Sequence, residues 1–206
     1  MESMTSRPAP MTRFAVRQRI TPIVNRYEIR RLDDAGNEGE LLALAQQKRI
    51  ALKELVTFYT DESRSTPVFA FRARQRIDLG ATYDVTDASG AQIGWFRKDF
   101  ARSLLRSTWH LGTADGLEAT GTERSQGIAI ARRLMENLPV VDAFPIPWVF
   151  HFDFTAGDGT PVLTSERKLS VRDRYAVTLP VAPNGWQLDW RVGAAMAVAL
   201  DALQAR

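Results

Sequence analysis

The C-terminal segment constrains the fold more than any other part of this 206-residue chain. From Val192 to Leu200 it reads VGAAMAVAL without a charge, and Asp189 is placed to cap a helix over about residues 189–204. A helix that is apolar all round must be buried on all sides. Such a helix is about 24 Å long, which is short for a membrane span. Its remaining residues are mostly alanine, so we expect a thin helix inside a closed sheet. Its large apolar residues do not share one face: Trp190, Val192, Met196, Val198, Leu200 and Leu203.

Alternation of apolar and charged residues indicates β-strands with one buried face. Phenylalanines alternate with arginines in residues 68–77, and residues 14–20 show the same pattern. The tetrapeptide RQRI occurs at 17–20 and again at 74–77, and hairpin turns follow at 34–37 and 87–90. A third, looser copy has its turn at 156–159. Repeated hairpin units of this kind predict one antiparallel β architecture.

The remaining elements complete a mainly β (α+β) fold. Further strands are predicted at residues 56–60, 92–97, 104–111, 148–154, 162–171 and 175–179, and a second helix at 124–137. Many antiparallel strands together with an apolar helix predict a closed antiparallel barrel with that helix as its core. We expect residues 13–206 to form a single domain and residues 1–12 a disordered tail. The tail lacks the apolar run of a signal peptide, so we expect a cytoplasmic protein.

Residues 71–109, FRARQRIDLGATYDVTDASGAQIGWFRKDFARSLLRSTW, resemble the LURP-one-related and scramblase-like proteins of the Tubby C-terminal-like superfamily. The stretches PWVFHFDF (147–154), RKLSVRDRYAVTL (167–179) and DWRVGAAMAVALDAL (189–203) extend the resemblance to most of residues 13–205. The resemblance implies a barrel of about twelve antiparallel strands around a buried C-terminal helix. The resemblance implies little about activity, because Tubby proteins bind membrane phosphoinositides, phospholipid scramblases are assigned calcium-dependent lipid movement, and plant LURP-one proteins are linked to defence. The scramblase PPxY region, cysteine cluster and acidic calcium loop have no counterpart here.

Catalytic and metal-binding motifs find little support. The chain has no cysteine and two histidines, His110 and His151, which excludes thiolate and multi-histidine metal sites. It has no G-x-S-x-G, P-loop, G-x-G-x-x-G or H-E-x-x-H motif. The spacing of His151 and Asp153 allows an oriented imidazole, but a polar strand face explains it as well. A hairpin turn rather than a calcium loop explains an acidic cluster whose glycine comes too early for an EF-hand: Asp33, Asp34, Asn37 and Glu38. We therefore expect no catalytic residue, metal or cofactor.

Rows of arginine are the strongest functional signal. Of the 27 basic residues 23 are arginine, and the net charge is +3. Planar guanidinium groups suit phosphate oxygens, which favours anionic phospholipid or phosphoinositide head groups as ligands. The candidate anionic-lipid-binding residues are Arg17, Arg19, Arg72, Arg74, Arg76, Arg97 and Lys98.

The arginine rows predict a non-enzymatic barrel, peripheral at the membrane, that binds such head groups or acts as an interaction module. Three alternatives remain. One is a solvated outer face protected from edge pairing. The others are an enzyme with an unrecognised polar site and a scramblase-like lipid protein. Nucleic acid is not expected, because the chain has no recognition-helix or stacking-platform motif.

Overall fold

The computed structural model describes residues 10–20, 24–48, 55–74, 81–99, 107–124, 151–168 and 174–204. These ranges contain twelve strands, β1 to β12, and the helix α2, which spans Trp190–Gln204. The strands in chain order are Arg13–Ile20, Val24–Leu32, Glu38–Lys48, Leu55–Tyr59, Pro67–Ala73, Thr82–Asp87, Gln92–Asp99, Thr108–Thr113, Glu118–Glu123, His151–Ala156, Pro161–Lys168 and Arg174–Thr178.

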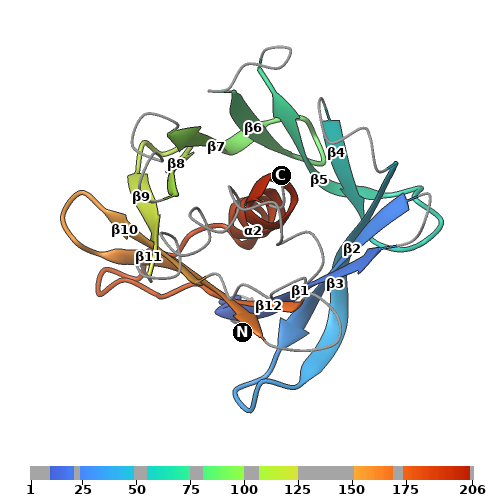
Figure 1. Ribbon diagram of the computed structural model, residues 1–206, viewed down its shortest axis with the longest axis horizontal. Coiled ribbons are helices and arrows are strands. Elements are labelled where there is room, and N and C mark those ends of the chain that lie inside the picture. Colours follow the sequence, from blue (N-terminus) through green and yellow to red (C-terminus); the bar gives the residue numbers. More distant parts are fainter. Residues whose placement is uncertain are drawn as a thin grey trace, which may run out of the picture.

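The sheet closes on itself as a barrel. Each strand pairs antiparallel with its neighbours in the sequence, and the last strand, β12, pairs with the first, β1. This closing register runs from Arg13 opposite Thr178 to Arg17 opposite Arg174. The helix α2 runs through the middle of the barrel (Figure 1). The predicted closed antiparallel barrel around a C-terminal helix is therefore confirmed.

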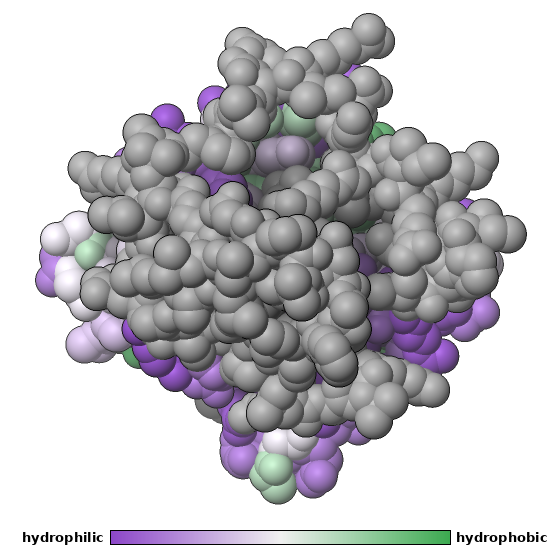
Figure 2. Space-filling model, viewed as in Figure 1, coloured by the Kyte–Doolittle hydropathy of each residue, from purple (hydrophilic) through white to green (hydrophobic). Residues whose placement is uncertain are grey.

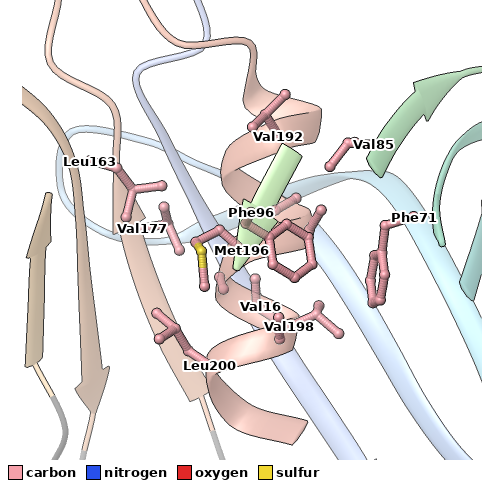
Figure 3. Close-up of a cluster of buried hydrophobic side chains, with 14 of the residues drawn as sticks. Val16, Phe71, Val85, Phe96, Leu163, Val177, Val192, Met196, Val198 and Leu200 are labelled. Carbon is pink, nitrogen blue, oxygen red and sulfur yellow. The ribbon is translucent and has the colours of Figure 1, made fainter. Parts of the chain in front are cut away.

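The helix α2 forms the core of the barrel. Oδ1 of Asp189 accepts a hydrogen bond from the backbone N–H of Arg191 at 2.8 Å, as an N-cap does. Every residue from Val192 to Leu200 is buried, and Met196 and Val198 have no exposed surface. Figure 3 shows that the side chains of the helix point in several directions and meet residues from different strands. A helix without a polar face is stable here because the sheet surrounds it.

Five loops share one turn, centred on a glycine with φ between 80° and 91°. In each, the glycine N–H bonds to the carbonyl three residues earlier at 2.8–3.1 Å, and that earlier residue donates to the carbonyl four residues on. Glycine adopts this positive φ without a steric penalty. The three turns predicted from the repeat are confirmed, and residues 113–117 and 182–186 form two more. The glycines are Gly36, Gly90, Gly116, Gly159 and Gly185.

The alternation did not delimit β3 or β9. In the middle of β3 both faces are buried, with Leu44 at 1% exposure and its neighbours Ala43 and Ala45 also buried, so the alternation is lost there. In β9 the inward residues Ala119 and Gly121 are small, and the ring of Phe154 fills the space over Gly121, where a Cβ atom would overlap it.

Some predictions fall where the structure is not described. The predicted helix over 124–137 lies outside the described residues except for Arg124, and the predicted tail is described only from residue 10. None of the described helices is long and apolar enough to cross a bilayer.

Candidate anion-binding site

Glu28 organises three arginines on the outer face of β1 and β2. Its side chain is 3% exposed although it lies on the outer face, because guanidinium groups cover it. The Nε atoms of Arg19, Arg26 and Arg30 lie 3.5, 3.0 and 3.5 Å from its carboxylate oxygens. Three cations around one buried anion leave an excess of positive charge on this surface.

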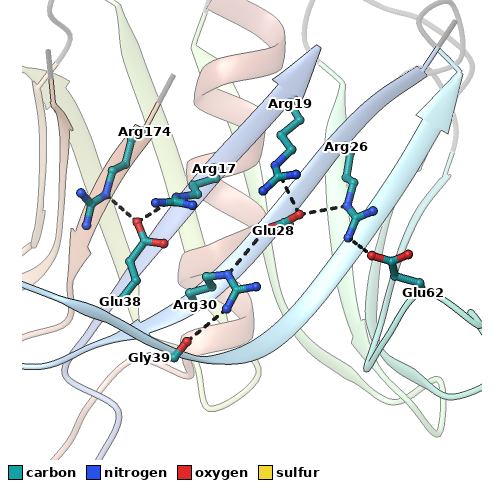
Figure 4. Close-up of polar contacts among 9 residues, drawn as sticks. All are labelled: Arg17, Arg19, Arg26, Glu28, Arg30, Glu38, Gly39, Glu62 and Arg174. Carbon is teal, nitrogen blue, oxygen red and sulfur yellow. Dashed lines mark hydrogen bonds and ion pairs between the residues drawn. The ribbon is translucent and has the colours of Figure 1, made fainter. Parts of the chain in front are cut away.

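Glu38 organises two further arginines beside the first group. Its Oε1 accepts a hydrogen bond from Nε of Arg17 at 2.8 Å, and Nε of Arg174 lies at the same distance (Figure 4). In both groups the nitrogen nearest the carboxylate is Nε, which leaves the terminal Nη atoms for other partners. We call this set the arginine cluster: Arg17, Arg19, Arg26, Glu28, Arg30, Glu38 and Arg174.

The second predicted arginine row divides into a paired and an unpaired residue. Arg74 donates from Nε and Nη2 to Asp84 at 2.7–3.0 Å, and these hydrogen bonds raise the pKa of its guanidinium. Arg72 is exposed and makes no hydrogen bond or ion pair within the described ranges. Arg76 lies outside the described residues.

Trp95 and Arg97 lie beside this row on β7. The strand pairing sets Asp84 opposite Trp95. The guanidinium carbon of Arg97 is 5.9 Å from the centroid of the Trp95 ring, which is a cation–π distance. The indole packs over Gly112 of β8, where a Cβ atom would overlap it. We call Arg72, Arg74, Asp84, Trp95 and Arg97 the β5–β7 face.

Lys98 does not belong to the β5–β7 face, although it follows Arg97 in the sequence. Neighbouring residues of a strand point to opposite faces of the sheet. The amino group of Lys98 lies 5.8 Å from the ring centroid of Trp109, which is fully buried inside the barrel. Lys98 is therefore separated from the outer arginines by the sheet itself.

The arginine cluster and the β5–β7 face lie on opposite sides of the barrel. In the closed order of twelve strands, β1 and β7 are six strands apart in either direction. Figure 1 shows them at opposite edges, and in Figure 2 the described residues along the rim are largely hydrophilic. A flat membrane cannot contact both surfaces at once. The residues predicted as one set therefore form two separate surfaces.

Three acidic partners were missed, although the sequence carries their signal: Glu28, Asp84 and Asp153. They occupy the middle of three related stretches, YEI (27–29), YDV (83–85) and FDF (152–154). In each stretch the acid faces outward and binds arginine; Asp153, for example, accepts hydrogen bonds from Arg124 at 2.7 and 2.8 Å. An acid between two inward-facing apolar residues must lie on the outer face, where the arginine rows are.

Comparison with known proteins places the fold in a family. A family model described as LURP-one-related matches residues 41–201, from β3 to α2. The chain belongs to the LURP-one-related family. No curated protein and no solved structure matches it significantly. The β5–β7 face lies within the matched residues, whereas β1 and β2 precede them. The wider link to Tubby and scramblase proteins stays an expectation from the sequence.

Asp153 of this LURP-one-related protein is used in an ion pair. Hydrogen bonds from Arg124 lower the pKa of its carboxyl group, and no hydrogen bond joins it to His151 within the described residues. Within the same ranges, no group of three His, Asp or Glu residues can hold a metal ion. The predicted polar strand face explains the two residues.

A second histidine has the partners of a nucleophile-activating base. His110 lies 3.1 Å from Oδ2 of Asp99 and 3.2 Å from Oγ1 of Thr120. These residues lie on β7, β8 and β9, whose backbone N–H groups pair with neighbouring strands. Within the described residues, His110 therefore links three neighbouring strands through side-chain hydrogen bonds.

An open cavity of about 360 Å³ lies at the N-terminal end of α2. Arg191, the cation in its lining, is held by Asp189 at 2.6 Å. No predicted site residue lines this cavity, and its charges compensate one another. Its lining residues are Met11, Val68, Gln187, Leu188, Asp189, Trp190 and Arg191.

Proposed function

We propose that this LURP-one-related protein is a non-enzymatic barrel that binds anionic membrane surfaces through the β5–β7 face. The observation that carries the proposal is the pair of exposed guanidinium groups, Arg72 and Arg97, beside Trp95. Neither has a carboxylate partner among the described residues. Guanidinium groups suit phosphate oxygens, and an indole suits the boundary between head groups and acyl chains. The protein would act in the cytoplasm, peripherally at the membrane.

The spacing on the β5–β7 face allows both arginines to reach one head group. Arg72 pairs with Asp84, and Arg97 pairs with Thr82 on the same strand. Their Cα atoms are therefore two strands and two residues apart, about 12 Å. Long side chains can converge over that distance.

The binding should be weak. A basic side chain near an anionic surface contributes about 1 kcal/mol. The charge of Arg74 is compensated by Asp84 at 2.7 Å, which leaves two effective arginines on this face. We therefore expect reversible binding that is lost at high salt.

Cosedimentation with vesicles tests the proposal. The wild-type protein should sediment at low salt with vesicles that contain phosphatidylserine, and not with phosphatidylcholine alone. The double variant Arg72→Gln/Arg97→Gln should lose this preference. The control Arg13→Gln/Arg31→Gln removes the same charge from β1 and β2 and should keep it. Equal losses in both variants, or no preference in the wild type, would overturn the proposal.

A further inference from the structure

The arginine cluster on the opposite side of the barrel carries a large local charge. Five guanidinium groups contribute five positive charges, and the buried carboxylates of Glu28 and Glu38 cancel two. The excess is concentrated on three adjacent strands, β12, β1 and β2. An excess of this kind on a rigid sheet attracts anions.

Arg17 and Arg19 have unused hydrogen-bond donors. A guanidinium carries five N–H bonds, and one is used where Nε faces a carboxylate. The four on the Nη atoms of each arginine have no partner among the described residues. The two side chains are 36% and 47% exposed and lie two residues apart on one face of β1, about 7 Å apart at Cα. That spacing suits two phosphoryl groups of one molecule.

The buried carboxylates hold these guanidinium groups in position. The side chains of Glu38 and Glu28 are 10% and 3% exposed, so they contact the arginines from the barrel side. An arginine that is already fixed loses less rotamer freedom when it binds a ligand. Arg17, which Glu38 binds at 2.8 Å, is therefore in position before an anion arrives, whereas Arg19, 3.5 Å from Glu28, keeps more freedom.

A loop beside the cluster supplies a competing anion. Oε1 of Glu62, between β4 and β5, accepts a hydrogen bond from Nη2 of Arg26 at 2.6 Å. The Glu62 side chain is 75% exposed, whereas Glu28, on the Nε side of the same guanidinium, is 3% exposed. Glu62 therefore contacts the cluster from the solvent side, where a phosphate oxygen would also bind.

We infer that the arginine cluster is a binding site for a compact polyphosphate, a ligand that carries two or more phosphoryl groups. Arg17 and Arg19 are its principal ligand residues, and Glu62 is an internal competitor. A soluble phosphorylated metabolite and a phosphorylated lipid head group share this chemistry. The inference does not rest on the proposed membrane function, because it concerns other residues on the opposite side of the barrel.

Calorimetric titration with tripolyphosphate at low salt tests the inference. The variant Arg17→Gln/Arg19→Gln should bind about tenfold more weakly or not at all, because two charge-assisted contacts are lost. The variant Glu62→Gln should bind several-fold more tightly, whereas Glu40→Gln, which removes another exposed acid, should match the wild type. The controls Arg13→Gln/Arg31→Gln and Arg72→Gln/Arg97→Gln should also keep the wild-type affinity.

The outcomes separate the ligand sources from failure of the inference. If the source is a lipid, the wild type should bind vesicles with phosphatidylinositol bisphosphate more tightly than phosphatidylserine vesicles of equal surface charge. The variant Arg17→Gln/Arg19→Gln should then lose this difference in binding. Binding of tripolyphosphate without such a difference identifies a soluble source. Absence of tripolyphosphate binding by the wild type, or equal weakening by Arg13→Gln/Arg31→Gln, overturns the inference. If Arg17→Gln/Arg19→Gln does not fold, an unchanged affinity in Glu62→Gln overturns it instead.

Discussion

The phenol of Tyr175 donates a 2.5 Å hydrogen bond to Oδ1 of Asp201 and ties the last strand of the barrel to the end of the helix inside it. Oδ2 of the same carboxylate accepts from Tyr27 at 3.3 Å, and Gln18 donates to the Tyr27 hydroxyl at 2.9 Å. Asp201 is 8% exposed, so its carboxylate depends on these donors. The otherwise apolar helix α2 is thus fastened by polar contacts far from its N-cap.

Replacing Tyr175 by Phe should lower the free energy of unfolding by about 1.5–3 kcal/mol, because a hydrogen bond to a buried charged group is lost. Urea denaturation measures the change. Tyr59→Phe is the matched control, since the Tyr59 hydroxyl makes no hydrogen bond among the described residues. Equal stability of Tyr175→Phe and the control would show that the bond to Asp201 contributes nothing.

Met196 tests whether the barrel needs its helix as a packed core. Met196→Ala should lower the free energy of unfolding by about 2–5 kcal/mol through the cavity it leaves. Met196→Asp should prevent folding, because an unpaired charge would be buried against a net stability of about 5–15 kcal/mol. Val181→Asp places the same charge at a residue with 46% exposure and should change the thermal midpoint little. A folded Met196→Asp protein would contradict the burial of α2.

Gly121 tests the close contact between β9 and the ring of Phe154. Gly121→Ala should lower the free energy of unfolding by about 1–3 kcal/mol, because the new methyl group overlaps the Phe154 ring. Gly157→Ala, in a turn where a Cβ atom meets no neighbour, is the control. The double variant Gly121→Ala/Phe154→Leu should recover part of the loss in thermal melts. If the losses of stability from the two single substitutions simply added in the double variant, the two residues would not compete for space.

The features set by local chemistry could be predicted from the sequence, and those set by register could not. The segment from Val192 to Leu200 has no polar face, so only a surrounding sheet can accommodate it. By contrast, Arg17 bonds to a glutamate 21 residues away on another strand, and no spacing along β1 reveals that partner. The position of the two arginine rows on opposite sides of the barrel also depends on the closing pair β1 and β12.

Glu28 tests whether the arginine cluster needs its buried carboxylates. Glu28→Gln should lower the free energy of unfolding by about 1.5–3 kcal/mol, because three guanidinium groups lose their common anion. Glu40→Gln should have almost no effect, since Glu40 is 70% exposed and lies 3.7 Å from Arg31. Chemical denaturation at low and high salt distinguishes the two, because added salt should reduce the loss in Glu28→Gln by screening repulsion.

The ion pair between Arg124 and Asp153 predicts an acid-dependent loss of stability. Hydrogen bonds and charge from Arg124 hold the pKa of Asp153 below its ordinary value of about 3.9. The folded protein therefore binds fewer protons there than the unfolded chain, so the stabilisation is complete above that value and declines as the pH falls through the lower folded pKa.

Arg124→Gln should consequently lower the thermal midpoint most near pH 6, and the difference from the wild type should shrink towards pH 3. Arg31→Gln is the control, because Arg31 lies 3.7 Å from its acidic partner Glu40. Its thermal midpoint should differ from that of the wild type by the same small amount at every pH in this range. Melting curves followed by circular dichroism at a series of pH values provide the measurement. A difference between Arg124→Gln and the wild type that stays constant down to pH 3 would show that the stabilisation by Arg124 does not depend on the charge of Asp153.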